Sequence, residues 1–103
     1  MTEGAPPSPA DVRDNAELSR FELPVGADVA YVTYRRLGGI VTLIHTEVPP
    51  ALRNRGIGSA LAKGALDLVR TQGFKIVPKC TFMISYLRNH SEYQDLLAVP
   101  LHT

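Results

Sequence analysis

The sequence has no tryptophan and only one cysteine, Cys80, so it cannot form an internal disulfide bond. It also lacks an apolar run of about 20 residues, the length that a helix needs to span a bilayer. Residues 1–10 contain neither the basic start nor the apolar stretch of a secretory signal. These absences argue against export and membrane insertion, and we expect a soluble cytoplasmic protein.

The chain has nearly equal numbers of basic and acidic residues, 11 and 10, so neither sign of charge dominates. The charges are nevertheless unevenly distributed along the sequence. Residues 53–88 hold seven Arg and Lys residues against Asp67 alone, a net charge of +6. A basic segment in a near-neutral protein indicates a local anionic partner rather than a broad nucleic-acid surface. Ordinary solvated side chains on one helix and its loops are the alternative interpretation.

The length and composition predict one domain, because 103 residues with 45% hydrophobic content fit a single core. Residues 1–10 hold three of the eight prolines and show no apolar periodicity, which predicts a disordered leader. The domain is then expected over residues 11–97, followed by a short tail at residues 98–103.

The first half of the domain shows the alternation of apolar and polar residues that is typical of strands. Apolar residues alternate from Phe21 to Val25, and Val29–Tyr34 is rich in β-branched and aromatic residues. Ile40–Val48 is the longest such run. Strict alternation would put Ile40, Thr42, Ile44, Thr46 and Val48 on one face, and Val41, Leu43, His45 and Glu47 on the other. With glycine turns between the runs, these segments predict an antiparallel meander.

The second half changes to the spacing of a helix. Ser59–Gln72 has the apolar stripe of an amphipathic helix, and Gly73 follows as its C-terminal stop. Gly64 costs this helix about 1 kcal/mol relative to alanine, so we expect a close approach to the sheet there. Phe74–Val77 should form a strand parallel to the long one, and Thr81–Asn89 a second helix. The predicted fold is α+β, a meander leading into a β-α-β unit and a C-terminal helix.

A glycine-rich turn, residues 53–59 with the sequence R-N-R-G-I-G-S, lies between the long strand and the first helix. Gly56 and Gly58 lack a Cβ, so main-chain N–H groups there can approach a bulky anion. A helix N-terminus adds unpaired donors and about half a positive charge. Arg53 and Arg55 add donors that suit phosphate oxygens. A plain turn with exposed arginines is the alternative, and the spacing matches neither a P-loop nor a dinucleotide-binding motif.

Three segments together give a resemblance to a known family. They are H-T-E-V-P-P-A-L-R-N-R-G-I-G-S-A-L at residues 45–61, V-P-K-C at residues 77–80 and H-S-E-Y-Q-D-L-L at residues 90–97. With R-x-x-G-x-G inside the first segment, the chain resembles the GNAT acetyltransferases, and a small single-domain GNAT-like group among them. The resemblance covers roughly residues 11–97. It implies that acetyl-CoA binds between two splayed parallel strands.

The resemblance also implies which residues hold acetyl-CoA. Main-chain groups of Thr46 and Val48 would bond the pantetheine arm as an added strand does. An N–H near Val48 would polarise the thioester carbonyl. The positive charge of Arg88 or Lys79, and not the resemblance, makes these two residues candidates for the remaining phosphate. The pyrophosphate would lie on the glycine-rich turn, that is on Arg53, Asn54, Arg55, Gly56, Ile57, Gly58 and Ser59.

Acetyl transfer needs a base for the amine and a proton for the departing thiolate. Tyr86 stands in the helix where many GNAT enzymes keep a tyrosine acid, but it fits a core aromatic equally well. Cys80 begins that helix, whose N-terminus favours a thiolate, so it is either a nucleophile or acid near the thioester or a buried apolar cysteine. His45 and Glu47 could relay a proton, although a lone strand histidine is more often structural. His90 is expected to cap a helix end, and we expect no metal site.

The sequence does not predict which acceptor is used, because the chain lacks the helices that shape the acceptor pocket of ordinary GNAT enzymes. The leading hypothesis is an N-acetyltransferase that acts on an amine of a small molecule or a protein. The alternative is a non-catalytic acyl-CoA-binding or protein-interaction module. Nucleic-acid binding is the weakest hypothesis, because aromatic residues do not alternate with the arginines.

Overall fold

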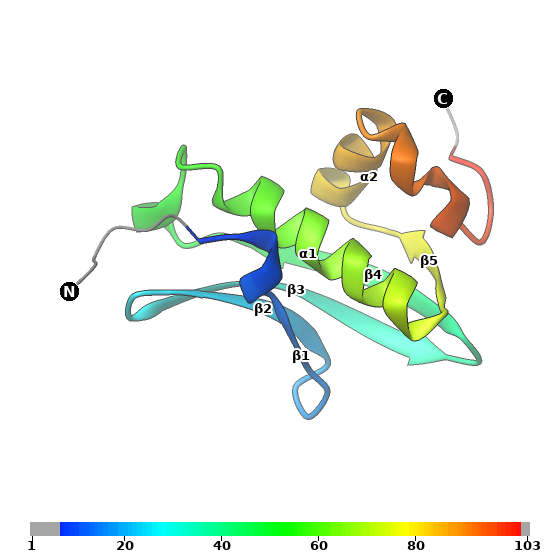
Figure 1. Cartoon of the computed structure of the whole chain (residues 1–103), viewed down its shortest axis with the longest axis horizontal. Coiled ribbons are helices and arrows are strands. Elements are labelled where there is room, and N and C mark those ends of the chain that lie inside the picture. Colours follow the sequence, from blue (N-terminus) through cyan, green and yellow to red (C-terminus); the bar gives the residue numbers. More distant parts are fainter. Residues whose placement is uncertain (1–6, 102–103) are drawn as a thin grey trace.

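The computed structural model of the chain describes residues 7–101, which form one five-stranded sheet with helices (Figure 1). The strands lie side by side in chain order, β1-β2-β3-β4-β5. They are β1 (Arg13–Asn15), β2 (Arg20–Val25), β3 (Asp28–Leu37), β4 (Ile40–Glu47) and β5 (Lys75–Pro78). The helices are α1 (Ile57–Gln72) and α2 (Thr81–Arg88), with 3-10 helices η1 (Pro9–Asp11), η2 (Pro50–Leu52) and η3 (Ser91–Leu96).

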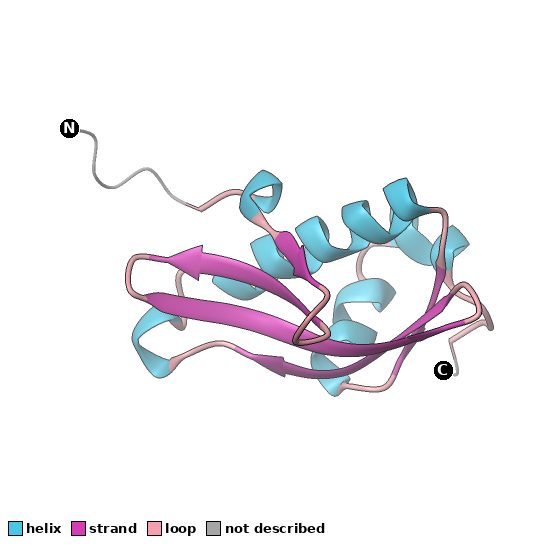
Figure 2. Cartoon of the chain, turned by 90° about the horizontal axis from the view of Figure 1, so that it is seen from below, coloured by secondary structure: helices cyan, strands magenta, loops and turns pink. Residues whose placement is uncertain are grey.

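The α+β architecture predicted from the sequence is confirmed. β2, β3 and β4 form the antiparallel meander, and β4 and β5 form the parallel pair. α1 connects that pair and lies along one side of the sheet (Figure 2), while α2 contacts α1, β4 and β5. The element ends differ slightly, because α1 already begins at Ile57 and α2 ends at Arg88. β1 pairs with β2 but is too short to show an alternation in the sequence.

β4 contains a β-bulge in its middle. Thr33 of β3 pairs with His45, while the next residue, Tyr34, pairs with Leu43, so Ile44 is the extra residue. An extra residue shifts the two-residue alternation of a strand, and every side chain beyond it changes face. The bulge therefore divides β4 into two halves with opposite alternation.

The bulge overturns the predicted faces of β4 beyond Leu43. Thr46 pairs with Val32, which is fully buried, so Thr46 lies on the face that α1 covers. His45 pairs with Thr33 on the opposite face. The prediction that Thr46 shares a face with the earlier even-numbered residues is wrong, because it assumed an alternation without interruption.

The hydrophobic core lies between α1 and the sheet, and α2 completes it. The largest fully buried side chains are Phe21, Leu23, Val32, Val41, Leu43, Ile57, Leu61, Leu66, Val69, Ile76, Met83 and Leu87. They come from β2 to β5 and from the inner faces of both helices, as the helical and strand periodicities predict. This core fixes the start of α1 and the start of α2 relative to β4.

Gly64 marks a close contact between α1 and the N-terminal segment. A Cβ at this position would lie 2.3 Å from Cγ2 of Val12 and 2.4 Å from the carbonyl oxygen of Pro9. The prediction of a close approach to the sheet is therefore wrong, because η1 and the residue after it are the partner. Residues 1–6 of the expected leader lie outside the described residues, whereas Ser8 forms a capping box with η1, which packs on α1.

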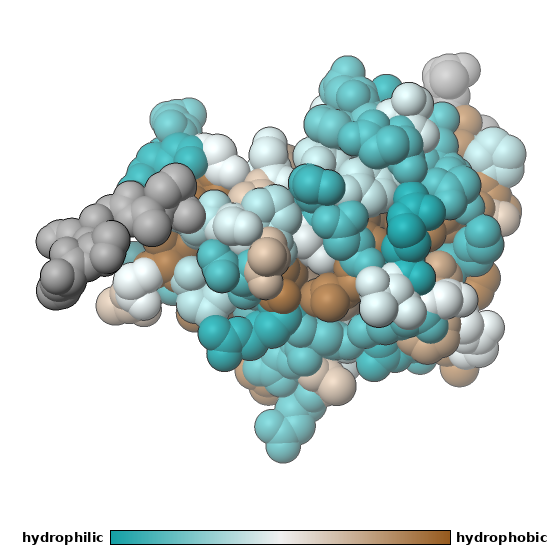
Figure 3. All heavy atoms as spheres, in the orientation of Figure 1, coloured by the Kyte–Doolittle hydropathy of each residue, from teal (hydrophilic) through white to brown (hydrophobic). Residues whose placement is uncertain are grey.

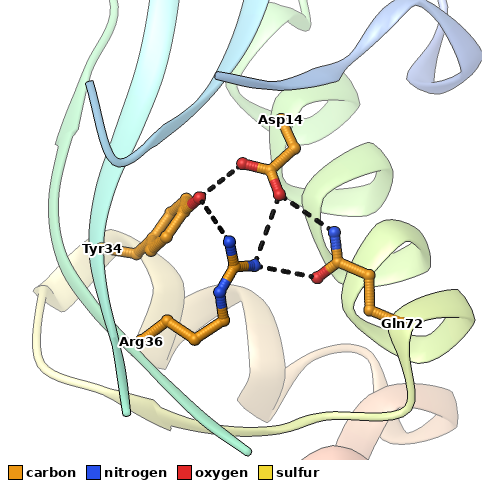
Figure 4. Close-up of polar contacts among 4 residues, drawn as sticks. All are labelled: Asp14, Tyr34, Arg36 and Gln72. Atoms are coloured by element: carbon orange, nitrogen blue, oxygen red, sulfur yellow. Dashed lines mark hydrogen bonds and ion pairs between the residues drawn. The ribbon is translucent and has the colours of Figure 1, made fainter. Parts of the chain in front are cut away.

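A polar cluster joins β1 and β3 to the end of α1 (Figure 4). Asp14 accepts hydrogen bonds from the Tyr34 hydroxyl at 2.5 Å and the Gln72 amide at 3.0 Å. Arg36 lies 3.4 Å from Asp14 and donates to the Gln72 carbonyl oxygen at 3.4 Å. Burial, together with the bond to Asp14, raises the pKa of Tyr34 to about 12. These groups satisfy one another, so the cluster stabilises the fold.

Candidate functional site

The parallel pairing of β4 and β5 ends before β4 does. The last pair is Leu43 with Pro78, and the N–H of Lys79 donates to the Leu43 carbonyl at 2.7 Å. Beyond it, within residues 7–101, the segment Ile44–Glu47 has no partner in β5. We call this segment the free edge of β4. The two parallel strands therefore part, as the predicted splayed pair requires, and leave main-chain groups available for an added strand.

Thr46 and Cys80 meet where the strands part. Thr46 Oγ1 and Cys80 Sγ lie 3.2 Å apart, at hydrogen-bonding distance, and either atom can donate. Cys80 is half-buried, and it is the N-cap residue of α2 without a side-chain hydrogen bond to that helix. Its thiol therefore lies beside the free edge of β4.

The glycine-rich turn leads directly into α1. Gly56 is the N-cap residue, with a φ of 74° in the left-handed region that favours glycine. Among residues 7–101 no side chain caps the start of this helix, and the N–H of Ala60 bonds to the Gly56 carbonyl at 3.1 Å. The N–H groups of residues 57–59 precede this bond, so they are the donors that a helix leaves unpaired. Their direction and partial charge suit an anion.

The glycine-rich turn borders a hollow of about 320 Å³. The outline of the molecule dips here, between the loop before α1 and α2 (Figure 3). The hollow is lined by Val48, Leu52, Arg53, Asn54, Gly56, Ile57, Gly58, Ser59 and Phe82. Arg53 Nε donates to the Val48 carbonyl at 3.1 Å, which holds the guanidinium at the end of β4. Most of the predicted cofactor residues therefore share one hollow, whereas Thr46, Arg55 and Arg88 are not among its lining residues.

Arg88 and Lys79 lie on a separate hollow of about 280 Å³ between β5, α2 and residues 99–101. Arg88 belongs to the last turn of α2. It stands six residues after Phe82, about 9 Å further along the helix. The structure therefore does not bring Arg88 together with the glycine-rich turn.

His45 and Glu47 form an exposed pair on the other face of β4. His45 Nε2 lies 3.0 Å from Glu47 Oε1, and the two side chains are 59% and 39% exposed. Thr46 points to the α1 side of the sheet, so His45 and the Thr46–Cys80 contact belong to different faces of β4. The pair is open to solvent and can take a proton from a group that arrives on its own face.

Tyr86 packs among aromatic rings in the second half of α2. Its ring stacks on His90 at a centroid distance of 3.7 Å, and Tyr93 lies 6.4 Å away. His90 Nδ1 is 2.7 Å from the Tyr86 carbonyl, so His90 caps the end of α2 as predicted. Burial raises the pKa of Tyr86, and the neighbouring Tyr93 adds to this. These contacts favour the core-aromatic interpretation of Tyr86 over the acid.

Known proteins share this fold and parts of this sequence. An NMR structure of a GCN5-like protein from Staphylococcus aureus matches with a TM-score of 0.67 and 24% identity, over 92% of this chain and 93% of that one. Protein NATD1 of Mus musculus is 34% identical over 99 residues, 87% of this chain and 90% of the relative. NATD1 of Gallus gallus is 42% identical over 85 residues, 80% and 77% of the two chains. The model of the GCN5-related N-acetyltransferases matches residues 20–96. The chain belongs to this family.

The part that matches the GCN5-related N-acetyltransferases contains the whole site. It runs from β2 to the end of η3, so it includes the free edge of β4, the glycine-rich turn and α2. The family generally uses acetyl-CoA as cosubstrate. Within residues 7–101, no helix is long and apolar enough to cross a membrane.

Sequence reasoning missed two residues of the hollow, Leu52 of η2 and Phe82. The ring of Phe82 belongs to α2, while the rest of the lining belongs to the segment from the end of β4 to the start of α1. The available signal was an aromatic residue two positions after Cys80, and helical periodicity alone does not show which neighbour such a residue meets.

Proposed function

We propose that this protein is an acetyl-CoA-dependent N-acetyltransferase whose acceptor is an amine of a small molecule or a protein. One observation carries the proposal: the uncapped start of α1 opens onto a hollow at the end of β4, next to the free edge of that strand. A diphosphate on the glycine-rich turn and an arm along the free edge would together form one continuous ligand path. Membership of the family supports the same cosubstrate.

The residues at the two ends of this path suit the diphosphate and the thioester of acetyl-CoA. At the turn, the guanidinium of Arg53 stands at the hollow together with main-chain donors that no side chain caps. At the other end, Thr46 and Cys80 supply a hydroxyl and a thiol within 3.2 Å of each other. Val48 lies between them and would offer its N–H to the thioester carbonyl.

The reaction needs one proton to leave the amine and one to reach sulfur. The neutral amine attacks the carbonyl carbon, and the N–C bond forms as the C–S bond breaks. His45, paired with Glu47, is the candidate that accepts the amine proton. The CoA thiolate takes a proton from Cys80, which is better placed than Tyr86 because Tyr86 packs against His90 and Tyr93. Solvent then reprotonates Cys80.

A non-catalytic acyl-CoA-binding module is the second candidate. It is favoured by the placement of the proton-transfer candidates, because His45 is exposed on one face of β4 while Cys80 meets the other. General acid–base catalysis gains most when both groups reach the reacting atoms together. This candidate expects CoA binding without transfer to any amine.

Calorimetric titration of CoA into matched variants tests the proposal. Gly56 and Gly73 stand at the two ends of α1, both with left-handed φ and open space around them. We expect Gly73→Glu to bind CoA as the wild type does, and Gly56→Glu to lose binding because its carboxylate repels the diphosphate. A wild type that does not bind CoA, or equal binding by both variants, contradicts the proposal. Mass spectrometry of amines incubated with acetyl-CoA then distinguishes the enzyme from the module.

A further inference from the structure

Phe82 is a large apolar side chain that stays 38% exposed beside the glycine-rich turn. Its ring rests on Gly58, where a Cβ would lie 2.9 Å from the Cζ atom of Phe82 and 3.2 Å from its Cε1 atom. Both residues line the same hollow. An aromatic ring from α2 therefore covers one side of a turn that belongs to α1.

This contact separates the roles of the two glycines in the turn. Gly56 needs a left-handed backbone, and a Cβ there would meet no atom of the described residues within 4 Å. Gly58 has no such backbone constraint, but the ring of Phe82 takes the space of its side chain. The requirement for glycine at position 58 is therefore set by an aromatic neighbour from another helix, in addition to any approach of an anion.

A diphosphate alone does not account for an exposed aromatic ring at this place. The N–H groups at the start of α1 and the guanidinium of Arg53 would bind any diphosphate, including a free nucleotide. CoA carries in addition an apolar arm, with a dimethyl-substituted carbon close to the diphosphate. An arm that runs from the turn to Cys80 passes the hollow, where Val48 and Phe82 are apolar lining residues.

We propose that Phe82 selects CoA over free nucleoside diphosphates by packing on the apolar part of the arm next to the diphosphate. The inference rests on the proposed function and names the residue that gives the site its preference. Contact between the Phe82 ring and the alkyl part of the arm removes apolar surface of both from water. Burial of about one such contact strengthens binding by roughly tenfold. Phe82 and Cys80 lie two residues apart at the start of α2, so the same contact holds the helix end that carries the thiol.

Titration of CoA and of ADP into the same variants measures this preference. For Phe82→Ala we expect about tenfold weaker binding of CoA and unchanged binding of ADP, which lacks the apolar arm. Phe82→Leu keeps an apolar side chain and should retain most of the preference. Leu37→Ala, which truncates a 77% exposed leucine on β3, is the matched control and should bind both ligands as the wild type does.

The contact with Gly58 supplies a second, independent measurement. Gly58→Ala should weaken CoA binding, because the new Cβ displaces the ring. When Phe82→Ala is already present, Gly58→Ala should cost clearly less affinity than in the wild type, since the clash with the ring is gone.

Three results would overturn the inference. The first is that Phe82→Ala binds CoA as tightly as the wild type does. The second is that Phe82→Ala weakens the binding of CoA and of ADP by the same factor. The third is that Gly58→Ala weakens CoA binding by the same factor whether or not Phe82 is present. Failure of the wild type to bind CoA at all would instead overturn the proposed function.

Discussion

The hydroxyl of Thr46 and the thiol of Cys80 face each other at 3.2 Å where β4 and β5 part. Two backbone features produce this contact: the bulge at Ile44 turns Thr46 to the α1 side, and the N-cap position of α2 places Cys80 opposite it. Cys80 is also the single cysteine of the chain. Thiol chemistry therefore reports on this one place in the molecule.

We expect CoA to slow the reaction of Cys80 with a thiol reagent several-fold, because an arm along the free edge of β4 would cover the sulfur. Mass spectrometry of the labelled chain over time measures the rate. Gly56→Glu, which should not bind CoA, is expected to label at the same rate with and without it. Wild-type labelling that CoA leaves unchanged under conditions where CoA binds would place the thiol away from the ligand.

We expect Gly64→Ala to destabilise the protein by about 1–3 kcal/mol, the usual cost of overpacking. In an open helix the same change would stabilise by about 1 kcal/mol. Here the new Cβ would lie 2.3 Å from Val12 and 2.4 Å from the carbonyl oxygen of Pro9. Urea unfolding measures the change, and Val12→Ala in the same chain should relieve part of it. A more stable Gly64→Ala variant would show that the N-terminal segment does not pack on α1.

We expect stability to fall as the pH rises from about 10 to about 12, partly through Tyr34. Its pKa in the fold is raised to about 12 by burial and by Asp14, so the unfolded chain loses this proton first, which lowers the free energy of the unfolded state relative to the fold. Asp14→Asn should lower the pKa of Tyr34, which absorbance at 295 nm follows. Tyr34→Phe should show a smaller fall over the same range, and a folded Tyr34 that titrates near 10 contradicts the assignment.

We expect Tyr93→Phe to cost about 1–3 kcal/mol, because it removes a buried hydroxyl that holds two charged groups. The hydroxyl donates to Asp67 at 2.6 Å and accepts from Lys63 at 2.8 Å, which ties η3 to α1. Thermal unfolding measures the loss. Tyr31→Phe, at a half-buried position on the open face of β3, is the control and should change little. Equal stability of the two variants would show that the hydrogen bonds of the Tyr93 hydroxyl to Asp67 and Lys63 do not stabilise the protein.

The parts of the fold that depend on local sequence were predictable. The alternation around Phe21–Val25 and the helical stripe of Ser59–Gln72 each extend over several residues, so their signal outweighs single exceptions. The glycine-rich turn was visible for the same reason, because two glycines and two arginines stand together before a helix. Its uncapped helix start and its place on a hollow agree with that interpretation.

The parts that depend on contacts between distant segments were not predictable. Ile44 looks like any strand residue, and only its pairing with β3 reveals the bulge. Gly64 and Phe82 meet partners that lie far away in the sequence, η1 and the turn before α1. The periodicity of the sequence does not indicate such long-range contacts, because they form only when the helices and strands pack against one another.

The extra residue in β4 accommodates three residue steps between two side chains on the same face, Leu43 and Thr46. Deleting Ile44 would leave these two residues at the spacing of a regular strand, so Thr46 and His45 would keep their faces while the local bend and added twist of the bulge would be lost. When other family members are aligned with this chain, a gap of one residue at Ile44 would therefore mark the loss of the bulge and not the loss of a functional group. A relative with one residue fewer there would present the same functional groups on a straighter strand.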